Sequence, residues 1–591
     1  MFAFHTALEA FLGSLAVLLL TSGIDDLIPF FTLIAGMALG KKKAATGADE
    51  LPERRIAIFV PCWRESAVIG NMVRHNLSVI RYHNFDFFLG VYPNDPDTVH
   101  VAEQLASEFS NVHVAICPNP GPTSKADCLN TAYQRMELFE AEQDARFDTV
   151  VLHDAEDLIH PQAFRVINRE RAHYEMVQIP VLPLPTGFSD VTHGVYMDEF
   201  SEYQFIDMRA REISGSFIPS NGVGTGFARE ILERLARDHN EQPFDPASLT
   251  EDYEIGVRIH EMGYRQTFAS LARSEQGLIA TREYFPRNTH AAIRQRTRWI
   301  TGIALQTWER HGWRGSWRTK YWFWRDRKGL LTNPISVLAN LVFFSGVLDY
   351  SLAKLLHHPW HFTVQSSTVA RLCATTLGLQ WFRTGLRSLC VGRIFGWQTA
   401  AGVLLRVFHA NLINSAATVC ALRNYVQARR RKHTLSWNKT DHHYPQRDTL
   451  HAHRRELADV LIGQGYLSAD QIADAQAQVE VGATLDLLLL ANRLIDEQSL
   501  CKAMSLQSGL PAARLDTPKV SAHVLRSLPL QLRHQCGVVP FAVKSGKLLV
   551  ATPSVPSTDI FDRVQEVSHL PIEFQLVTPS VFRQLCEHAH N

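Results

Sequence analysis

The 591-residue sequence lacks the paired cysteines that mark zinc sites and disulfide frameworks. Its nine cysteines are scattered, and no two of them stand in a Cys-x-x-Cys pair. We therefore expect reduced thiols, as in a cytosolic compartment. The sequence also lacks net charge, because 59 basic residues balance 59 acidic residues. This balance gives no support for a nucleic-acid partner, and none is expected.

Two glycine-rich phosphate-binding motifs are also absent. The sequence contains neither Gly-x-Gly-x-x-Gly nor Gly-x-x-x-x-Gly-Lys-Ser/Thr, which weakens the case for a dinucleotide-binding fold or a P-loop. A cleaved signal peptide is not expected either. Such a peptide carries positive charge before its apolar core, whereas here the charge follows it.

The N-terminal region is apolar except for one acidic pair. Residues 10–24 and 27–40 are apolar and are separated by Asp25-Asp26. Paired acids are costly in lipid, so we predict a loop between two short membrane segments. The basic run at residues 41–43 then places the following domain in the cytoplasm. Residues 1–43 are therefore predicted to form a membrane anchor.

Short apolar runs alternate with helical patterns in the first third of the chain. Strands that alternate with helices form mostly parallel sheets. We therefore predict a doubly wound α/β domain over residues 52–312. The expected strands are residues 55–60, 87–92, 112–116 and 149–152, with helices at 66–80 and 99–109 between them.

Acidic residues follow three of these expected strands. Glu65, Asp95 and Asp154 come after successive strand ends, where open α/β sheets bind ligands. Asp154 and Glu156 are two residues apart and share a face of an extended backbone. Together they could reach one Mg²⁺ or Mn²⁺ ion, which usually arrives with a substrate's phosphates. The alternative is a solvated acidic turn before Pro161.

Three further stretches are candidates for binding or catalysis. The glycine-rich turn at residues 222–226 would let backbone approach a ligand, although ordinary loops look the same. Thr250-Glu251-Asp252 precedes an amphipathic helix, and it also has the composition of a simple helix cap. The stretch QRTRW at residues 295–299 opens an aromatic region. It is either an interfacial helix or a tryptophan platform for a sugar beside an arginine for a diphosphate.

Taken in order, these motifs resemble the membrane-bound family 2 glycosyltransferases with the GT-A fold. The matching motifs are PCWRE, NDPD, KADCLN, HDAED, TED and QRTRW, and they span about residues 52–300. REYFP and WRDRKG extend the resemblance toward the bacterial phage-adsorption protein B group, also called NfrB-like. One departure is that Glu156 stands where the DxD motif has its second aspartate, which retains a carboxylate but changes its reach.

The resemblance implies roles at a donor site. Glu65 and Asp95 would contact the uracil and ribose of a UDP-linked sugar, and Lys125 would lie near the nucleotide. Asp154 and Glu156 would hold Mg²⁺ or Mn²⁺ on the diphosphate.

The resemblance also implies catalytic and acceptor residues. Asp252, beside Glu251 in the TED motif, would be the general base that deprotonates the acceptor hydroxyl. Gln295, Arg298 and Trp299 would hold the diphosphate and the acceptor end.

The implied function is an inverting transferase of the bacterial inner membrane. It would use a nucleotide sugar and a glycan or lipid-linked acceptor to build or extend a cell-surface polysaccharide. A role in phage adsorption and an outer-membrane export partner would follow. The alternatives are a single-sugar transferase acting on a lipid carrier and a degenerate scaffold kept for export.

Residues 313–428 are expected to be interfacial and membrane-spanning. Apolar stretches lie at roughly 330–356, 366–382 and 395–422. Arg371 makes the second a poor lipid-facing helix, and Arg406 does the same for the third. Both flanks should be cytoplasmic by charge, so one stretch is predicted to be re-entrant or interfacial. Buried helices of a soluble domain are the alternative.

After a polar linker at residues 429–452, a small α+β domain is predicted over 453–591. Its helical part repeats at an offset of 28 residues, since RELADVLIGQGYLSADQI resembles TLDLLLLANRLIDEQSL. The domain resembles the MshEN domain of secretion ATPases, in which each repeat carries an Arg-Leu-Gly signature that binds cyclic di-GMP. It could therefore be a regulatory or a docking domain.

The Arg-Leu-Gly signature is eroded in both repeats. The first repeat reads Glu456-Leu457-Ala458 and the second reads Thr484-Leu485-Asp486. Arg454 and Arg455 are the remaining candidates for contacting cyclic di-GMP. A carboxylate at 486 would repel a phosphate where the family has glycine, so weak or absent binding is expected.

Overall fold

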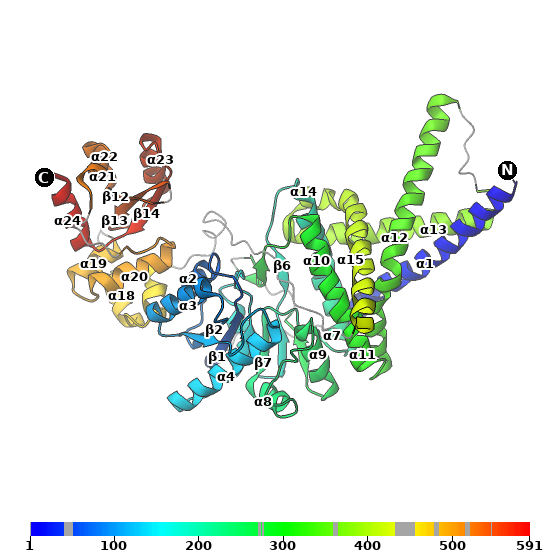
Figure 1. Cartoon of the computed structure of the whole chain (residues 1–591), viewed down its shortest axis with the longest axis horizontal. Coiled ribbons are helices and arrows are strands. Elements are labelled where there is room, and N and C mark those ends of the chain that lie inside the picture. Colours follow the sequence, from blue (N-terminus) through cyan, green and yellow to red (C-terminus); the bar gives the residue numbers. More distant parts are fainter. Residues whose placement is uncertain are drawn as a thin grey trace. The chain divides into compact units, whose positions relative to one another are not determined.

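The computed structural model describes residues 2–40, 51–269, 273–274, 277–357, 364–431, 456–477, 484–513, 520–544 and 546–590 (Figure 1). The chain divides into two compact units. One comprises Met1–Gly70 and Asn84–Tyr444, and the other comprises Asn71–His83 and Pro445–Asn591. The predicted contacts of Arg454 and Arg455, the basic run 41–43 and linker residues 432–452 lie outside the described residues.

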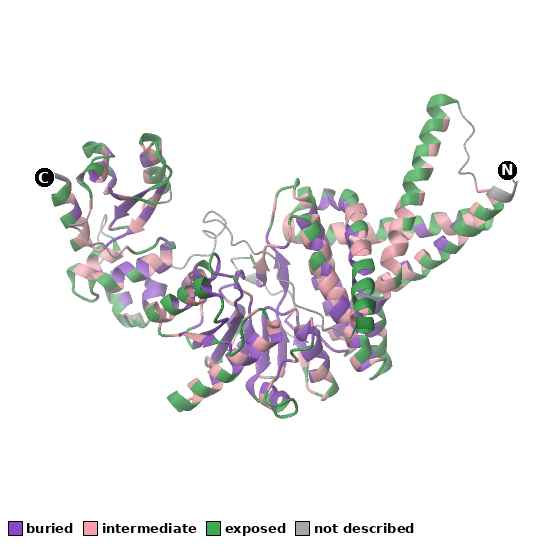
Figure 2. Ribbon diagram, in the orientation of Figure 1, coloured by how far each residue is buried: buried purple, intermediate pink, exposed green. Residues whose placement is uncertain are grey.

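A seven-stranded sheet with the order β3-β2-β1-β4-β7-β5-β8 forms the centre of the first unit. The first four strands in this order are parallel, as predicted, whereas β7 runs antiparallel to both of its neighbours. Most of the strand residues are buried (Figure 2). The strands are β1 (Ile56–Pro61), β2 (Phe85–Val91), β3 (Val112–Ile116), β4 (Thr149–Leu152), β5 (Met176–Gln178), β7 (Thr225–Ala228) and β8 (Gln266–Phe268).

Helices pack on this sheet through one apolar core. Phe59 and Val150 of the sheet, Leu129 and Tyr133 of the following helix, and Phe227 are all fully buried in it. The helices that contribute residues to this core are α4 (Lys125–Gln143), α8 (Arg229–Arg237) and α9 (Glu251–Glu261). Helices α3 (Pro96–Glu108) and α5 (Ala163–Arg171) belong to the same unit, whereas most of α2 (Ile69–Val79) belongs to the second. Short pairs are formed by β6 (Val181–Pro183) with β11 (Thr281–Glu283), and by β9 (Arg273–Ser274) with β10 (Gly277–Leu278).

Helix α1 (Phe2–Ala38) continues without a break through Asp25 and Asp26. The predicted loop between two short segments is therefore wrong. The physical reason is that both acids are neutralised: Lys328 Nζ lies 2.6 Å from Asp25 Oδ2, and Arg383 Nη1 lies 2.6 Å from Asp26 Oδ2. Paired charges of this kind can remain inside a helical bundle.

Three of the described helices are long and apolar enough to cross a membrane: α1, α12 (Trp317–Leu356) and α15 (Val403–Arg431). Helix α13 (Ser367–Phe395) is long but is not one of them. The predicted apolar stretch 395–422 is not continuous, because α14 (Trp397–Ala401) ends at Gly402 before α15 begins. Arg406 does not face lipid, since its Nη2 lies 2.7 Å from Asp198 Oδ1.

Six other helical segments connect the sheet to these long helices. Helix α6 packs against α13 and α15, and α10 packs against α15. Two segments have the wider π-helical winding, which often occurs at functional sites. The segments are α6 (Val191–Glu202), the π-helix η1 (Tyr203–Asp207) with α7 (Met208–Ser214), and α10 (Thr289–Trp299) with the π-helix η2 (Ile300–Gln306) and α11 (Thr307–His311).

In the second unit, a repeated helical pair precedes a small sheet. The helices of the two repeats begin 28 residues apart, at Leu457 and Leu485 and again at Ala469 and Glu497, which confirms the repeat. In the sheet, β13 is antiparallel to β12 and parallel to β14. The elements are α17 (Leu457–Gly463), α18 (Ala469–Ala477), α19 (Leu485–Ala491), α20 (Glu497–Ser508), α21 (Ala522–Leu525), α22 (Leu530–Cys536), β12 (Val539–Lys544), β13 (Lys547–Thr552), α23 (Thr558–Val567), β14 (Ile572–Leu576) and α24 (Pro579–His590).

Candidate functional site

The acids that follow β1 and β2 lie in tightly organised loops. Glu65 is 4% exposed and Asp95 is 8% exposed. The backbone N–H of Arg64 donates to Asp95 Oδ2 at 2.5 Å, and that of Glu65 donates to Thr98 Oγ1 at 2.9 Å. Arg64 has a φ of 56°, a conformation that costs energy in an arginine and is often found at functional sites. This turn links the ends of two neighbouring parallel strands.

Lys125 and Asp154 form an ion pair at the same edge of the sheet. Helix α4 begins at Lys125, and the Ser124 side chain caps it by accepting a hydrogen bond from the Asp127 N–H. Lys125 Nζ lies 2.5 Å from Asp154 Oδ1. Burial opposes the charge of Lys125, but Asp154, Glu251 and Asp252 together raise its pKa above the ordinary value. Lys125 is therefore a fixed cation among three acids.

A buried His153–Asp157 pair shapes the turn after β4. His153 Nδ1 lies 2.7 Å from Asp157 Oδ2, and both side chains are fully buried. Asp157 Oδ2 also accepts the Asp154 N–H at 3.0 Å. Burial raises the pKa of the Asp157 carboxyl, and its contact with His153 opposes that shift. This pair was not predicted from the sequence, although its four-residue spacing within HDAED was a signal for it.

Glu251 and Asp252 occupy the first turn of α9. Burial raises the pKa of Asp252, while Lys125 and Arg298 oppose that shift. Burial and then repulsion from Asp252 raise the pKa of Glu251 to about 7. Asp252 Oδ1 accepts a hydrogen bond of 2.8 Å from the Tyr253 N–H. The pair therefore combines an ionisable base with a neighbour that titrates near neutrality.

The glycine-rich turn approaches Asp252 closely. Gly222 has a φ of +78°, and a Cβ atom there would lie 2.6 Å from Asp252 Oδ2 and 3.5 Å from Lys125 Nζ. Gln178 holds the turn, because its Oε1 accepts hydrogen bonds from the Asn221 N–H at 2.9 Å and from Thr225 Oγ1 at 2.6 Å. Only a residue without a side chain fits this position.

The QRTRW stretch supplies Arg298 to this cluster. Arg298 is close enough to act electrostatically on Glu251 and Asp252. Gln295 Oε1 is buried and has no hydrogen-bond partner among the described residues. Trp299 instead packs in an aromatic cluster, with ring centroids 6.1 Å from Tyr196, 6.3 Å from Phe200 and 6.5 Å from Phe285.

The π-helix η2 follows the QRTRW stretch and contacts the residues directly before Glu251 and Asp252. A Cβ atom on Gly302 would lie 2.2 Å from Thr250 Oγ1, so the π-helix contacts the residue directly before Glu251. Gln306 Oε1 accepts a hydrogen bond of 3.0 Å from the Leu249 N–H. Arg298 and the two acids are therefore held in one framework.

The carboxylates suit a metal that arrives with its ligand. Within the described ranges, no group of three or more histidine, cysteine or acidic side chains is placed to hold a metal ion. Asp154 and the buried Glu156 offer hard oxygen donors after β4. Two carboxylates fit Mg²⁺ or Mn²⁺, which commonly complete their coordination with phosphate oxygens and water.

Sequence comparisons match both parts of the chain. The model described as glycosyltransferase like family 2 matches residues 52–302, and the MshEN domain model matches residues 508–590. Bacteriophage adsorption protein B of Escherichia coli K12 is 32% identical over 572 residues, which cover 91% of this chain and 76% of that protein. Bacteriophage N4 adsorption protein B of Escherichia coli O157:H7 matches to the same extent.

Structural comparisons give more distant likenesses. A mannosyltransferase from Pyrobaculum calidifontis, solved with GDP-Man and Mn²⁺, has 16% identity and a TM-score of 0.43 over 70% of this chain and 99% of that one. A structure of MshE with cdg has 21% identity and a TM-score of 0.20 over 23% of this chain and 98% of that one.

Proposed function

This chain belongs to the bacteriophage adsorption protein B family of family 2 glycosyltransferases with a C-terminal MshEN domain, and from that premise we propose that it is an active, inverting transferase. Its donor is a nucleotide sugar, UDP-linked, and its acceptor is a glycan or a lipid-linked sugar. The product is a cell-surface polysaccharide that serves in phage adsorption. The long apolar helices α1, α12 and α15 support a membrane location.

The observation that carries this proposal is the convergence of Asp252, Lys125 and Gly222. Asp252 is a base beside a fixed cation, and the adjacent Gly222 brings backbone rather than a side chain to its Oδ2 atom. Burial raises the pKa of Asp252, and a higher pKa makes a carboxylate a stronger base. These features suit a group that takes a proton from a bound hydroxyl.

The proposed reaction is a single displacement. Asp252 removes the acceptor hydroxyl proton as that oxygen bonds to the anomeric carbon of the donor sugar. The bond between this carbon and the diphosphate oxygen breaks on the opposite face, which inverts the anomeric centre. The electron pair leaves with the nucleoside diphosphate, and Lys125 and Arg298 offset its negative charge.

The donor and the acceptor end would be held by the surrounding groups. Glu65 and Asp95 suit the uracil and ribose, because they follow neighbouring strands of the same sheet edge. Asp154 and Glu156 would hold Mg²⁺ or Mn²⁺, which when bound would neutralise charge on the leaving diphosphate. Gln295 Oε1, which no donor of the described residues reaches, is suited to accept a hydrogen bond from the acceptor.

Two further parts of the proposal concern Trp299 and the location of the protein in the cell. Trp299 supports the acceptor side by anchoring α10 in its aromatic cluster. We propose that the catalytic and C-terminal domains lie on the cytoplasmic side of the inner membrane. An export protein of the outer membrane would receive the product.

The test is a donor screen on the full chain in detergent. The protein is incubated with a panel of nucleotide sugars and Mg²⁺ or Mn²⁺, and release of nucleoside diphosphate is measured. We expect release with a UDP-linked sugar and loss of release in EDTA. If none of the nucleotide sugars gives release, the alternative of a non-catalytic scaffold is favoured. One turnover per lipid acceptor would favour single-sugar transfer.

A separate variant tests whether Glu156 holds the metal ion. Glu156→Ala is expected to weaken metal-dependent UDP binding at least about tenfold, whereas Glu142→Ala on the exposed part of α4 leaves it unchanged. Lost turnover with unchanged affinity for UDP and metal would show that Glu156 does not hold the ion.

A further inference from the structure

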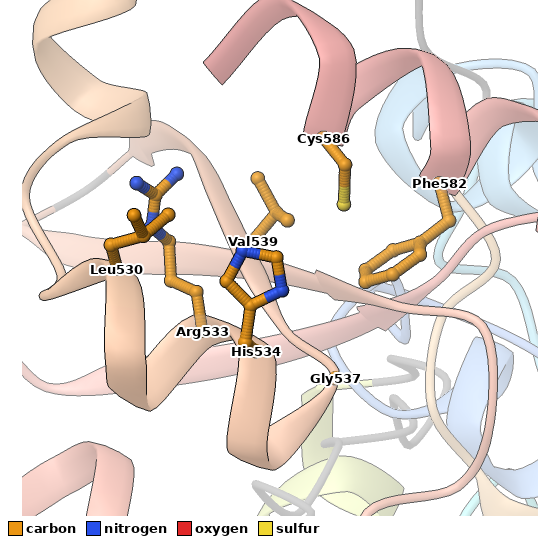
Figure 3. A pocket seen from close by; sticks show the side chains of 7 residues that line it. All are labelled: Leu530, Arg533, His534, Gly537, Val539, Phe582 and Cys586. Atoms are coloured by element: carbon orange, nitrogen blue, oxygen red, sulfur yellow. The ribbon is translucent and has the colours of Figure 1, made fainter. Parts of the chain in front are cut away.

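The second unit contains a small cavity far along the chain from the residues discussed above. It has a volume of about 80 Å³ and is lined by Leu530, Arg533, His534, Gly537, Val539, Phe582 and Cys586. Side chains from α22 and α24 face each other across it, with Val539 of β12 between them (Figure 3).

Arg533 is the unusual member of this lining. It is only 9% exposed, and its buried Nε has no hydrogen-bond partner among the described residues. None of the lining residues is an aspartate or glutamate. Its backbone is fixed by ordinary helix contacts, since the Arg533 N–H donates to the Pro529 oxygen and its own oxygen accepts from the Val538 N–H. The helix therefore fixes the backbone of Arg533, and no side chain of the described residues forms an ion pair with its guanidinium.

Four other buried arginines have carboxylate partners, whereas the buried Arg327 donates to the Gly312 oxygen instead; the four are Arg211, Arg229, Arg296 and Arg406. Arg406 Nη2 lies 2.7 Å from Asp198 Oδ1, and Arg229 Nη2 lies 3.0 Å from Glu140 Oε2. A buried cation without a partner is costly, and a charge-assisted bond to an anion offsets that cost. Arg533 has neither kind of partner among the described residues, so its guanidinium is available to an anionic ligand.

The neighbouring thiol does not supply the missing charge. Burial raises the pKa of Cys586, and the Arg533 charge opposes that shift only in part. The thiol therefore stays protonated near neutral pH and presents an apolar sulfur surface.

The volume of the cavity and the residues that line it restrict which ligands can bind there. Pockets for drug-sized molecules measure about 300–1,000 Å³, so a cavity of about 80 Å³ is too small to enclose a nucleotide sugar or a cyclic dinucleotide. Leu530, Val539 and Phe582 are apolar. Arg533 and His534 are the main side-chain donors of the lining, so a phosphate would leave oxygens against apolar groups. A carboxylate can instead pair with one guanidinium while its alkyl chain contacts the apolar residues.

We propose that this cavity binds a small organic monocarboxylate of about three or four carbons, with its carboxylate on Arg533 and its alkyl part against Val539 and Phe582. The site is independent of the proposed transferase reaction. It provides the C-terminal domain with a small-molecule ligand other than a cyclic dinucleotide.

The test uses the full-length protein in detergent and butyrate as the probe. Binding of radiolabelled butyrate is measured by equilibrium dialysis, with the neutral amide butyramide and inorganic phosphate as competitors. Alkylation of Cys586 by iodoacetamide is followed by peptide mass spectrometry. We expect one saturable butyrate per chain, no competition by butyramide, weak competition by phosphate, and at least fivefold slower alkylation of Cys586 when butyrate is bound.

Two variants locate the site. Arg533→Gln is expected to bind butyrate at least tenfold more weakly. Arg583→Gln removes an exposed arginine from α24 and is expected to bind like the wild type. Unsaturable binding, equal competition by butyramide, displacement by phosphate as effective as by butyrate, or unchanged binding in folded Arg533→Gln would each overturn the proposal. The wild-type competition decides the question even if Arg533→Gln does not fold.

Discussion

Gly222 shows how one residue without a side chain sets the geometry of the acidic cluster. Gly222 has a φ of +78° and approaches Asp252 closely, and both features require glycine at this position. Gly263 offers a matched comparison, since its φ is +83° but an added Cβ would meet nothing within 4 Å. The two positions therefore share backbone strain and differ only in what surrounds them.

We predict that Gly222→Ala lowers transfer at least about tenfold, because a Cβ atom would push Asp252 and Lys125 out of position. Gly263→Ala is expected to cost about as much stability without lowering transfer. Initial rates and melting temperatures of both variants check this. Equal activity of the two variants would show that the close approach of Gly222 is unimportant.

Glu251 gives a prediction about pH. With its pKa raised to about 7, the folded protein binds this proton more tightly than the unfolded chain, whose glutamate titrates near about 4.3. The stabilising effect of the proton is complete below about pH 4.3 and is lost as pH rises through about 7. Above that pH, the buried charge beside Asp252 destabilises the fold.

Glu251→Gln should therefore be stabilising at pH 8 and nearly neutral at pH 5. A shift of this size corresponds to about 2–4 kcal/mol, or a rise of a few degrees in apparent melting temperature. Thermal unfolding of both proteins across this pH range measures the difference. The exposed Glu230→Gln on α8 is the control, and an effect of Glu251→Gln that does not grow with pH would contradict the assignment.

At the scale of elements, ion pairs join the long helices to one another. Asp26 of α1 contacts Lys328 and Arg325 of α12 and Arg383 of α13, and its side chain is only 6% exposed. Glu202 of α6 accepts hydrogen bonds from Arg387 of α13. The acids that interrupt the apolar N-terminal region therefore act as contacts between helices.

Asp26→Asn would remove one carboxylate from this network, while Lys328 keeps Asp25, Arg325 keeps Asp207 and Arg383 keeps Glu202. We predict that Asp26→Asn destabilises the full chain by about 1.5–3 kcal/mol, the contribution of a hydrogen bond between charged groups. The check is the fraction that remains monodisperse in detergent after heating, measured by size-exclusion chromatography. Lys354→Met, at the exposed end of α12, is expected to behave like the wild type. A wild-type heating profile for Asp26→Asn would show that the network contributes little.

The sequence predicted helices and strands better than it predicted the contacts between them. Alternating strands and helices predicted the parallel strands β1 to β4, because that pattern is local. The antiparallel position of β7 between β4 and β5 depends on pairing across distant segments. Asp25 was misread as part of a loop because its partner Lys328 comes 303 residues later in the chain.

The same distinction applies to the site. The resemblance to a family selected Asp154, Glu251 and Asp252 by motif. The contact of Lys125 with Asp154 and the approach of Gly222 to Asp252 could not be predicted, because they depend on the positions of separate loops in space.

At the scale of the whole molecule, the C-terminal domain raises the question of cyclic di-GMP. We predict that the full chain binds it weakly or not at all, with a dissociation constant above about 10 µM. The reason is that Ala458 and Asp486 replace glycines, and Glu456 and Thr484 replace arginines that would pair with phosphate; each such pair is worth about 1.5–3 kcal/mol.

Calorimetry on the detergent-solubilised protein measures this affinity. Restoring Arg-Leu-Gly in both repeats, with Glu456→Arg, Ala458→Gly, Thr484→Arg and Asp486→Gly, is expected to produce tighter binding. A submicromolar dissociation constant for the wild type would instead show that other groups compensate, with Arg454 and Arg455 the first to test.

The most direct test of the proposed transferase is the Asp252→Asn variant, assayed with the nucleotide sugar that the wild type uses. An amide cannot accept the acceptor's proton, and general-base catalysis contributes about 10² to 10⁴ in rate. We predict that Asp252→Asn transfers sugar at least about 100-fold more slowly while its dissociation constant for UDP stays within about twofold of the wild type, and that the surface control Asp238→Asn matches the wild type in both. Transfer by Asp252→Asn at the wild-type rate would contradict the account.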